Sequence, residues 1–285
     1  MASSALPGEE FRASLARVNH PRTPTLARAI SRELISEVRG VLRQRRLRPG
    51  LLSGATHAGF CPICGGDTRF VERGPWLRDE YCCLRCGSIP RGRALIHALD
   101  VHFPAWRTLR IHESSPGGAA SNKLQRECSA YLPTHFFPDL PSGQSRDGFR
   151  SENLEQQTFG DQEFDLVITQ DVFEHVLRPG LAFAEIARTL RPGGAHVFTV
   201  PWYFWKPTLV RAVPENGGVR HLEVPDYHGN PIDAQGSLVV REWGLELLDF
   251  IREASGLQTT VVRPWDRRLG IDGEFREVFV SRKPA

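Results

Sequence analysis

Four of the six cysteines have the spacing of a metal site. Cys61 and Cys64 form one C-x-x-C pair, and Cys83 and Cys86 form a second pair eighteen residues later. Each pair is followed by glycine, and such turns direct two thiolates at one point. Four thiolates complete tetrahedral Zn²⁺ and leave no open position for a reactant. We therefore predict a zinc ribbon whose Zn²⁺ is structural; nucleic-acid binding through the ribbon is the less favoured alternative.

A second group of reactive side chains follows an apolar run at 164–169. The run is rich in β-branched residues, as in a buried parallel strand. A helical pattern over 181–190, an R-P-G-G stop and another apolar run over 195–200 complete a βαβ unit. Ligands of open α/β sheets bind beyond the carboxyl ends of the strands. The polar residues expected at that edge are Gln170, Asp171, Glu174 and His175.

Two segments carry a resemblance to a known family. FDLVITQDVFEHV followed by EIARTLRPGGAHVFTVP resembles the late half of class I S-adenosylmethionine-dependent methyltransferases of type 11. CLRCGSIPRGR, a helix predicted over 89–103 and a strand over 108–112 resemble the members that have an N-terminal four-cysteine zinc ribbon. The resemblance covers about residues 60–200 and implies a Rossmann-like, seven-stranded α/β sheet with S-adenosylmethionine as cofactor.

The resemblance also implies where the cofactor would bind. After the first strand the family has an acid and a G-x-G-x-G loop, whereas this chain has ESSPGG at 113–118. A second strand is predicted over 134–137, and the acid after it would accept hydrogen bonds from the ribose or would be a turn residue. The segment SENLE at 151–155 would hold the adenine. The implied cofactor-binding residues are Glu113, Ser114, Ser115, Gly117, Asp139, Asn153, Leu154 and Gln170.

Candidate catalytic residues lie in two places. Asp171 would orient bound groups, and His175 would act as a base or brace the turn. A long segment at 201–238 begins with four aromatic residues and is predicted to form a lid over the carboxyl edge of the sheet. Within it, His228 or Tyr227 could deprotonate a hydroxyl or amine; the alternative is a packed insertion with a turn.

The chain of 285 residues can form one large domain and a small module. We predict a basic helical segment at 1–58, the ribbon at 59–90 and a methyltransferase domain at 91–285. The first fifty residues hold ten arginines and four glutamates, although the net charge is only +3. The chain contains no run of eighteen apolar residues, and its cysteine pattern suits a reducing compartment, so we predict a cytoplasmic protein. A helix over 238–253 and strands over 257–262 and 275–281 would close the sheet.

These observations predict an enzyme that transfers a methyl group to oxygen or nitrogen of a small molecule or a sugar-containing metabolite. One alternative is a non-catalytic binding module that lost the glycine loop. Another is a nucleic-acid methyltransferase that uses the ribbon and the basic residues Arg43, Arg45, Arg46 and Arg48. The sequence leaves the oligomeric state open.

Overall fold

The structure, a computed structural model, describes residues 54–230 and 235–285. These described residues form one compact unit. Residues 1–53 of the basic helical segment predicted at 1–58, and with them the four arginines of the nucleic-acid alternative, lie outside the described residues. No helix among the described residues is long and apolar enough to cross a membrane.

A small antiparallel sheet holds the four cysteines of the predicted ribbon. Its glycines explain the knuckle turns: Gly65 and Gly87 have φ of 65° and 68°, and each amide hydrogen bonds back to the first cysteine of its pair. Only glycine adopts this left-handed conformation without a steric penalty. The elements are β1 (Thr56–Cys61), β2 (Gly66–Glu72), α3 (Leu77–Glu80) and β3 (Tyr81–Cys83).

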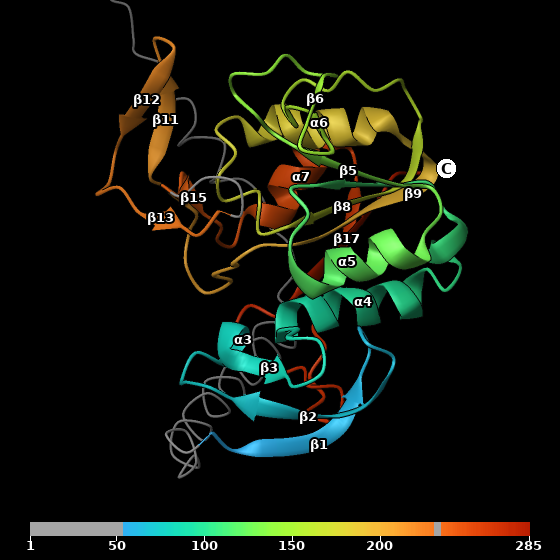
Figure 1. Cartoon of the computed structure of the whole chain (residues 1–285). Coiled ribbons are helices and arrows are strands. Elements are labelled where there is room, and N and C mark those ends of the chain that lie inside the picture. The colour runs from blue at the N-terminus through green and yellow to red at the C-terminus, as the bar shows by residue number, and fades with distance from the viewer. Residues whose placement is uncertain (1–53, 231–234) are drawn as a thin grey trace, which may run out of the picture. The chain divides into compact units, whose positions relative to one another are not determined.

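The main sheet has eight strands in the order β16-β17-β9-β8-β4-β5-β7-β6 (Figure 1). Strands β7, β5, β4, β8 and β9 run parallel, whereas β17 pairs antiparallel with both β9 and β16. The closing antiparallel hairpin is therefore confirmed, and a two-residue edge strand, β6, is added to the expected seven. The strands are β4 (Ile111–Ser114), β5 (Tyr131–His135), β6 (Ser145–Arg146), β7 (Phe149–Ser151), β8 (Phe164–Gln170), β9 (Leu190–Thr199), β16 (Gln258–Val262) and β17 (Val278–Arg282).

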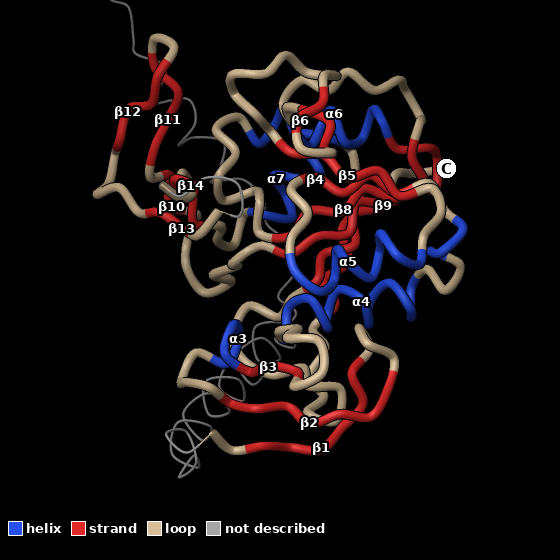
Figure 2. Tube along the Cα trace, viewed as in Figure 1, coloured by secondary structure: helices blue, strands red, loops and turns tan. Residues whose placement is uncertain are grey.

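Helices cover both faces of this sheet (Figure 2). Helices α4 (Pro90–His102) and α5 (Gly118–Glu127) lie on one face, and α6 (Pro179–Thr189) and α7 (Leu247–Ser255) lie on the other. Each face has its own apolar core, and the core under α4 and α5 continues into the small cysteine-bearing sheet through Phe70 and Tyr81. The short 3-10 helix Trp106–Thr108 leads into β4.

Three predicted element boundaries were wrong. The first two strands begin at Ile111 and Tyr131 rather than at residues 108 and 134. The R-P-G-G segment belongs to β9, where a register shift against β8 accommodates the extra residues, so this strand begins at Leu190.

The helix predicted over 238–253 begins only at Leu247. The preceding residues are extended because Gly244 packs directly on another backbone segment. A Cβ atom at Gly244 would lie 2.3 Å from the Lys206 carbonyl oxygen. A glycine inside a helical pattern can mark such a close approach, and here it overrides the apolar periodicity.

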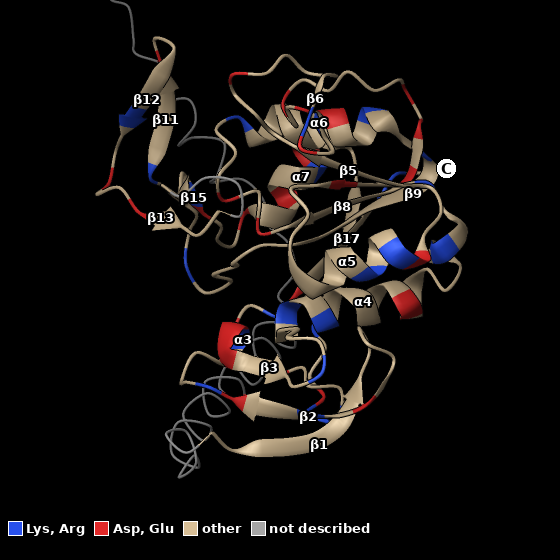
Figure 3. Cartoon of the chain, viewed as in Figure 1, with Lys and Arg blue, Asp and Glu red and all other residues tan. Residues whose placement is uncertain are grey.

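The described residues of the predicted lid segment form short strands. A hairpin of β11 (Ala212–Glu215) and β12 (Gly218–His221) precedes the pair β13 (Tyr227–His228) and β14 (Ser237–Leu238), while β10 (Leu209–Val210) pairs with β15 (Arg241–Glu242). These pairs form two-stranded sheets separate from the main sheet, and the β10–β15 pair joins the insertion to the segment that leads into α7. Over the described part of the chain, basic and acidic residues are interspersed rather than gathered on one element (Figure 3).

Candidate functional site

A cavity of about 1320 Å³ opens at the carboxyl ends of β4, β5 and β8. This is the edge at which open α/β sheets bind ligands. The cavity walls come from the segment around the cysteine-bearing sheet, from the main sheet with its helices, and from the insertion at 201–238. The residues that line it include Arg78, Arg91, Ser114, Ser115, Gly117, His135, Asn153, Leu154, Gln170, Asp171, Glu174, His175, Tyr203, His228 and Phe275.

Glu113, at the end of β4, is fully buried and does not line the cavity. Its carboxylate accepts hydrogen bonds from Ser121 Oγ and Gln170 Nε2, each at 2.8 Å, and from the Tyr131 hydroxyl at 2.5 Å. Burial raises the pKa of Glu113, although the three hydrogen bonds act in the opposite direction. Glu113 therefore lies beneath the loop and stabilises both this loop and the start of α5. Direct contact between Glu113 and a cofactor would need a rearrangement.

Ser115 takes the conformation that glycine usually supplies in such loops. Its φ is 56°, and its amide donates to the Thr134 carbonyl at 2.7 Å. The chain then turns through Gly117, which precedes α5, so the first amides of that helix lie at the cavity wall. A helix N-terminus favours a negatively charged group. The ESSPGG loop thus keeps the backbone path of a binding loop without its first glycines.

We expect Ser115→Gly to leave the protein as stable or to stabilise it by up to about 1 kcal/mol. A left-handed non-glycine residue costs roughly 1–2 kcal/mol, which glycine's greater unfolded-state entropy partly offsets. The adjacent Ser114→Gly is the matched control. Ser114 is buried in an extended strand, where glycine should destabilise by about 0.5–1 kcal/mol. Chemical denaturation measures both, and equal destabilisation by the two variants would contradict the strain at Ser115.

The predicted adenine residues and the predicted ribose acid are placed differently. Asn153 and Leu154 line the cavity. Asp139 does not: its carboxylate forms a two-point ion pair with Arg146 on the exposed surface. His135, at the end of β5, takes the position at the wall instead, and burial lowers its pKa and so favours a neutral imidazole. The preference for an acid after the second strand hid this histidine from sequence reasoning.

Asp171 is held by arginines that sequence analysis did not identify as site residues. Its Oδ2 lies 2.5 Å from Arg78 of α3 and 3.0 Å from Arg91 of α4, and its Oδ1 accepts from Thr199 at 2.9 Å. Burial opposes ionisation, but the two arginines outweigh it and lower the pKa of Asp171 to about 2. A carboxylate this acidic is a poor general base, and its geometry suits an orienting role.

Glu174, His175 and His228 come together on one wall of the cavity. The Glu174 Oε1 atom lies 3.8 Å from His175 Nε2 and 3.8 Å from His228 Nδ1. Glu174 raises the pKa of His228. Tyr227, the other predicted base, is 54% exposed and does not line the cavity. The structure thus assembles His175 and His228 from distant segments and leaves Tyr227 outside.

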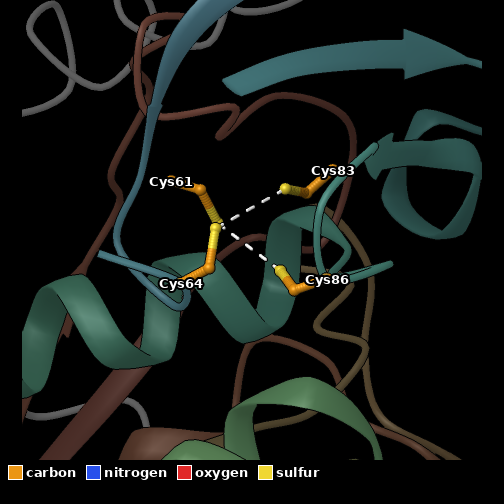
Figure 4. Close-up of side chains that lie close together, drawn as sticks. All are labelled: Cys61, Cys64, Cys83 and Cys86. Atoms are coloured by element: carbon orange, nitrogen blue, oxygen red, sulfur yellow. Dashed lines mark hydrogen bonds between the residues drawn. The ribbon is translucent and has the colours of Figure 1, made fainter. Parts of the chain in front are cut away.

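The four cysteines of the two C-x-x-C pairs point toward one another (Figure 4). Their sulfur atoms all lie within 4.8 Å, with 3.8 Å between Cys61 and Cys86 and 3.9 Å between Cys64 and Cys83. Burial and the neighbouring thiolates raise the pKa of Cys64. Cys83 is also buried, but hydrogen bonds, led by one from Thr68, lower its pKa to about 6. Four ionised thiolates this close require a compensating cation.

Arg93 joins the cysteine-bearing sheet to the main domain. The side chain is completely buried in α4 and donates to three carbonyl oxygens. It reaches Tyr81 at 2.6 Å, Gly270 at 2.6 and 2.9 Å, and the carbonyl of Ser88. Its guanidinium also stacks over Phe70, 4.7 Å from the ring centre. Sequence reasoning placed an arginine-bearing helix here but could not show that this arginine points inward.

Residues 123–198 match the family model described as a methyltransferase domain. The matched stretch runs from α5 to β9 and includes β5 and β8, two of the three strands whose carboxyl ends meet the cavity, whereas β4 precedes it. It covers less than half of the chain. Together with the eight-stranded mixed sheet, the match supports the class I methyltransferase fold. No curated protein matches this sequence.

Several solved structures are similar at low identity. An S-adenosylmethionine-dependent methyltransferase from Mesorhizobium loti is 17% identical, with 67% of this chain and 98% of that chain covered and a TM-score of 0.44. S-adenosylmethionine-bound CalS10, an amino pentose methyltransferase from Micromonospora echinaspora, is 18% identical over 69% and 92% of the chains, with a TM-score of 0.44. The 1,6-didemethyltoxoflavin N1-methyltransferase of Burkholderia thailandensis is 16% identical over 68% and 79%, with a TM-score of 0.41. Likeness at this level establishes neither activity nor substrate.

Proposed function

We propose that this protein transfers a methyl group from S-adenosylmethionine to a small molecule or a sugar-containing metabolite. The observation that carries the proposal is the cavity at the carboxyl edge of the sheet. Ser115, in its left-handed conformation after β4, and Gly117, at the N-terminus of α5, both line this cavity. The match of residues 123–198 to a methyltransferase domain supports it. The cofactor would supply an electrophilic methyl group on a sulfonium.

The residues present fit the cofactor's three chemical parts. The amides at the start of α5, with Ser114 and Ser115, would face its carboxylate. Asn153 would offer its amide to the adenine edge, and Leu154 an apolar surface to the ring. His135 takes the role proposed for Asp139 at the ribose, since its neutral ring can both donate and accept.

The remaining space suits an acceptor beside the cofactor. Ligand pockets typically measure roughly 300–1,000 Å³, so a cavity of about 1320 Å³ has room for two molecules. Aromatic rings also line the cavity, and the ring centres of Tyr203 and Phe275 lie 5.0 Å apart. Such a wall favours a compact acceptor whose apolar face or sugar ring packs on aromatic side chains. Holding donor and acceptor in line is the main contribution expected of the protein.

We propose further that the four cysteines bind one structural Zn²⁺. With Zn–S bonds of about 2.3 Å, the edges of a regular tetrahedron measure about 3.8 Å. The observed sulfur separations of 3.8 and 3.9 Å agree with two such edges. The ion would crosslink the two knuckles and thereby support α3, which carries Arg78 to the cavity.

Calorimetric titration with S-adenosylmethionine and with S-adenosylhomocysteine tests the cofactor site. We expect micromolar binding of both. Gly117→Asp should weaken binding about tenfold or more, because the new carboxylate would repel that of the cofactor at the start of α5. Gly117→Ser is the control: both residues are favourable at a helix start, so both variants should fold.

Two results would count against this proposal. If the folded wild-type protein binds neither compound, the methyltransferase function is wrong, and a non-catalytic binding module becomes the better explanation. If both Gly117 variants bind as well as the wild type, the cofactor's carboxylate does not lie at α5.

A further inference from the structure

A buried carboxylate without hydrogen bonds lies beside two imidazoles at the cavity wall. Glu174 is only 2% exposed, and neither of its side-chain oxygens has a hydrogen-bond partner among the described residues. The nitrogens of His175 and His228 are 3.8 Å from Oε1, which is too long for a hydrogen bond. A buried carboxylate with neither donors nor a bound cation is costly. A cation bound among the three side chains would therefore offset the cost of burying the Glu174 carboxylate.

The orientation of His175 is that of a metal ligand. Its Nδ1 lies 2.9 Å from the Leu238 carbonyl oxygen. Because a carbonyl only accepts, Nδ1 must carry the proton, and the lone pair of Nε2 then faces Glu174. Metal-binding histidines usually donate their other ring nitrogen in this way, which fixes the tautomer and the ring.

The same short ladder positions both histidines. Leu238 of β14 pairs with Tyr227 of β13, and Ser237 pairs with His228. The ladder thus holds His228 and the carbonyl that orients His175. The two imidazole rings are 5.3 Å apart and nearly perpendicular, at 89°. Their ligand nitrogens and a Glu174 oxygen all lie within 4.8 Å of one another.

Neighbouring arginines compensate Glu174 less directly than they compensate Asp171. Asp171, one turn earlier, takes up Arg91 and Arg78. Arg78 also acts on Glu174 through its charge, but its ion pairs within 4.0 Å are with Asp171 and Asp79. Of two carboxylates three residues apart, Asp171 is therefore paired with two arginines and a hydroxyl, whereas the ion-pair partners of Glu174 within 4.0 Å, among the described residues, are the two imidazoles.

We propose that Glu174, His175 and His228 bind a divalent first-row transition-metal ion at the cavity wall. Two imidazoles and one carboxylate suit Fe²⁺, Co²⁺ or Zn²⁺ and leave coordination positions open. All three side chains line the cavity, so an oxygen donor of a molecule in the cavity would complete the coordination. This site is separate from the four cysteines and needs no cofactor in order to bind metal.

Titration of the zinc-loaded full chain with Co²⁺ tests the site without any assay of activity. Calorimetry should show one Co²⁺ per chain in the micromolar range. Its near-ultraviolet absorption should lack the intense thiolate-to-cobalt charge-transfer bands expected if Co²⁺ entered the cysteine site. Losing a hydrogen-bond partner of a ligand lowers metal affinity about 10- to 100-fold, so Glu174→Gln and His228→Ala should weaken binding at least that much. His221→Ala, an exposed histidine of the same insertion, is the control and should bind as the wild type does.

Thermal unfolding gives a second readout that does not depend on the proposed methyl transfer. Without added metal, Glu174→Gln should melt at or above the wild-type temperature, because it removes a buried charge. Added Co²⁺ should raise the melting temperature of the wild type and of His221→Ala, but not that of Glu174→Gln. Absence of Co²⁺ binding, binding only at the thiolates, or equal binding by Glu174→Gln and His228→Ala would overturn the proposal. Failure to bind S-adenosylmethionine would not, so the two proposals fail independently.

Discussion

Cys83→Ser is expected to remove one zinc ion per chain relative to the wild type and to unfold the small sheet that carries the cysteines. Zinc binding to four-ligand sites contributes roughly 10–16 kcal/mol to folding near pH 7. Cys83 is 1% exposed, and hydrogen bonds hold its pKa at about 6 despite burial, so it is ionised at neutral pH. Serine cannot replace a thiolate as a zinc ligand. The loss should therefore exceed what an ordinary buried substitution causes.

Metal analysis and thermal unfolding of the same preparations measure this effect. Cys82→Ser is the matched control, because Cys82 is the adjacent buried cysteine and its sulfur lies 3.7 Å from the Asp79 carbonyl oxygen, apart from the four others. It should keep the wild-type zinc content. Equal zinc content and equal melting temperature in the two variants would show that Cys83 is not a ligand.

Arg93→Met should destabilise the protein by about 3–5 kcal/mol. The substitution leaves the buried carbonyls of Tyr81 and Gly270 without the Arg93 donor, and each unsatisfied group costs roughly 1–3 kcal/mol, whereas the Ser88 carbonyl keeps the hydrogen bond from the Cys83 amide. Burial lowers the pKa of Arg93 to about 10 against the nearby thiolates, so it stays charged at neutral pH. It should also compensate part of the negative charge of a four-thiolate zinc site.

Chemical denaturation measures this loss, and Arg85→Met is the control. Arg85 belongs to the second knuckle but is exposed, with a hydrogen bond to the Asp67 carbonyl at 3.2 Å. Its replacement should change stability by no more than about 0.5 kcal/mol. Similar losses in both variants would mean that the buried hydrogen bonds of Arg93 contribute little.

Predictions from short-range pattern agree best with the structure. The apolar run at 164–169, the helix at 89–103 and the closing hairpin each reappear within a few residues of the expected bounds. These elements bury continuous apolar surface, so the pattern and the fold favour the same conformation. The helix over 238–253 failed because Gly244 and Trp243 pack against residues 202–208, an interaction that no local pattern contains.

The candidate site was predictable where neighbours in the sequence are also neighbours in space. Ser115, Asn153 and His175 were expected at the cavity and line it, whereas Glu113, Asp139 and Tyr227 were expected there and do not. Their residue types were informative, but the direction of a side chain depends on its partners. Tyr131 and Ser121 turn Glu113 inward, and Arg146 pairs with Asp139 on the surface.

The sequence by itself determined the α/β alternation, the four-cysteine spacing and the turn at which polar residues follow β8, because backbone geometry and short-range packing specify these features. Only the tertiary structure decided which charges meet. Arg78 reaches Asp171 across 93 residues, and His228 comes from the insertion to Glu174. The energy of such contacts depends on burial and on distances that the whole fold sets. Asp171 therefore pairs with arginines, whereas Glu174 lies beside two imidazoles.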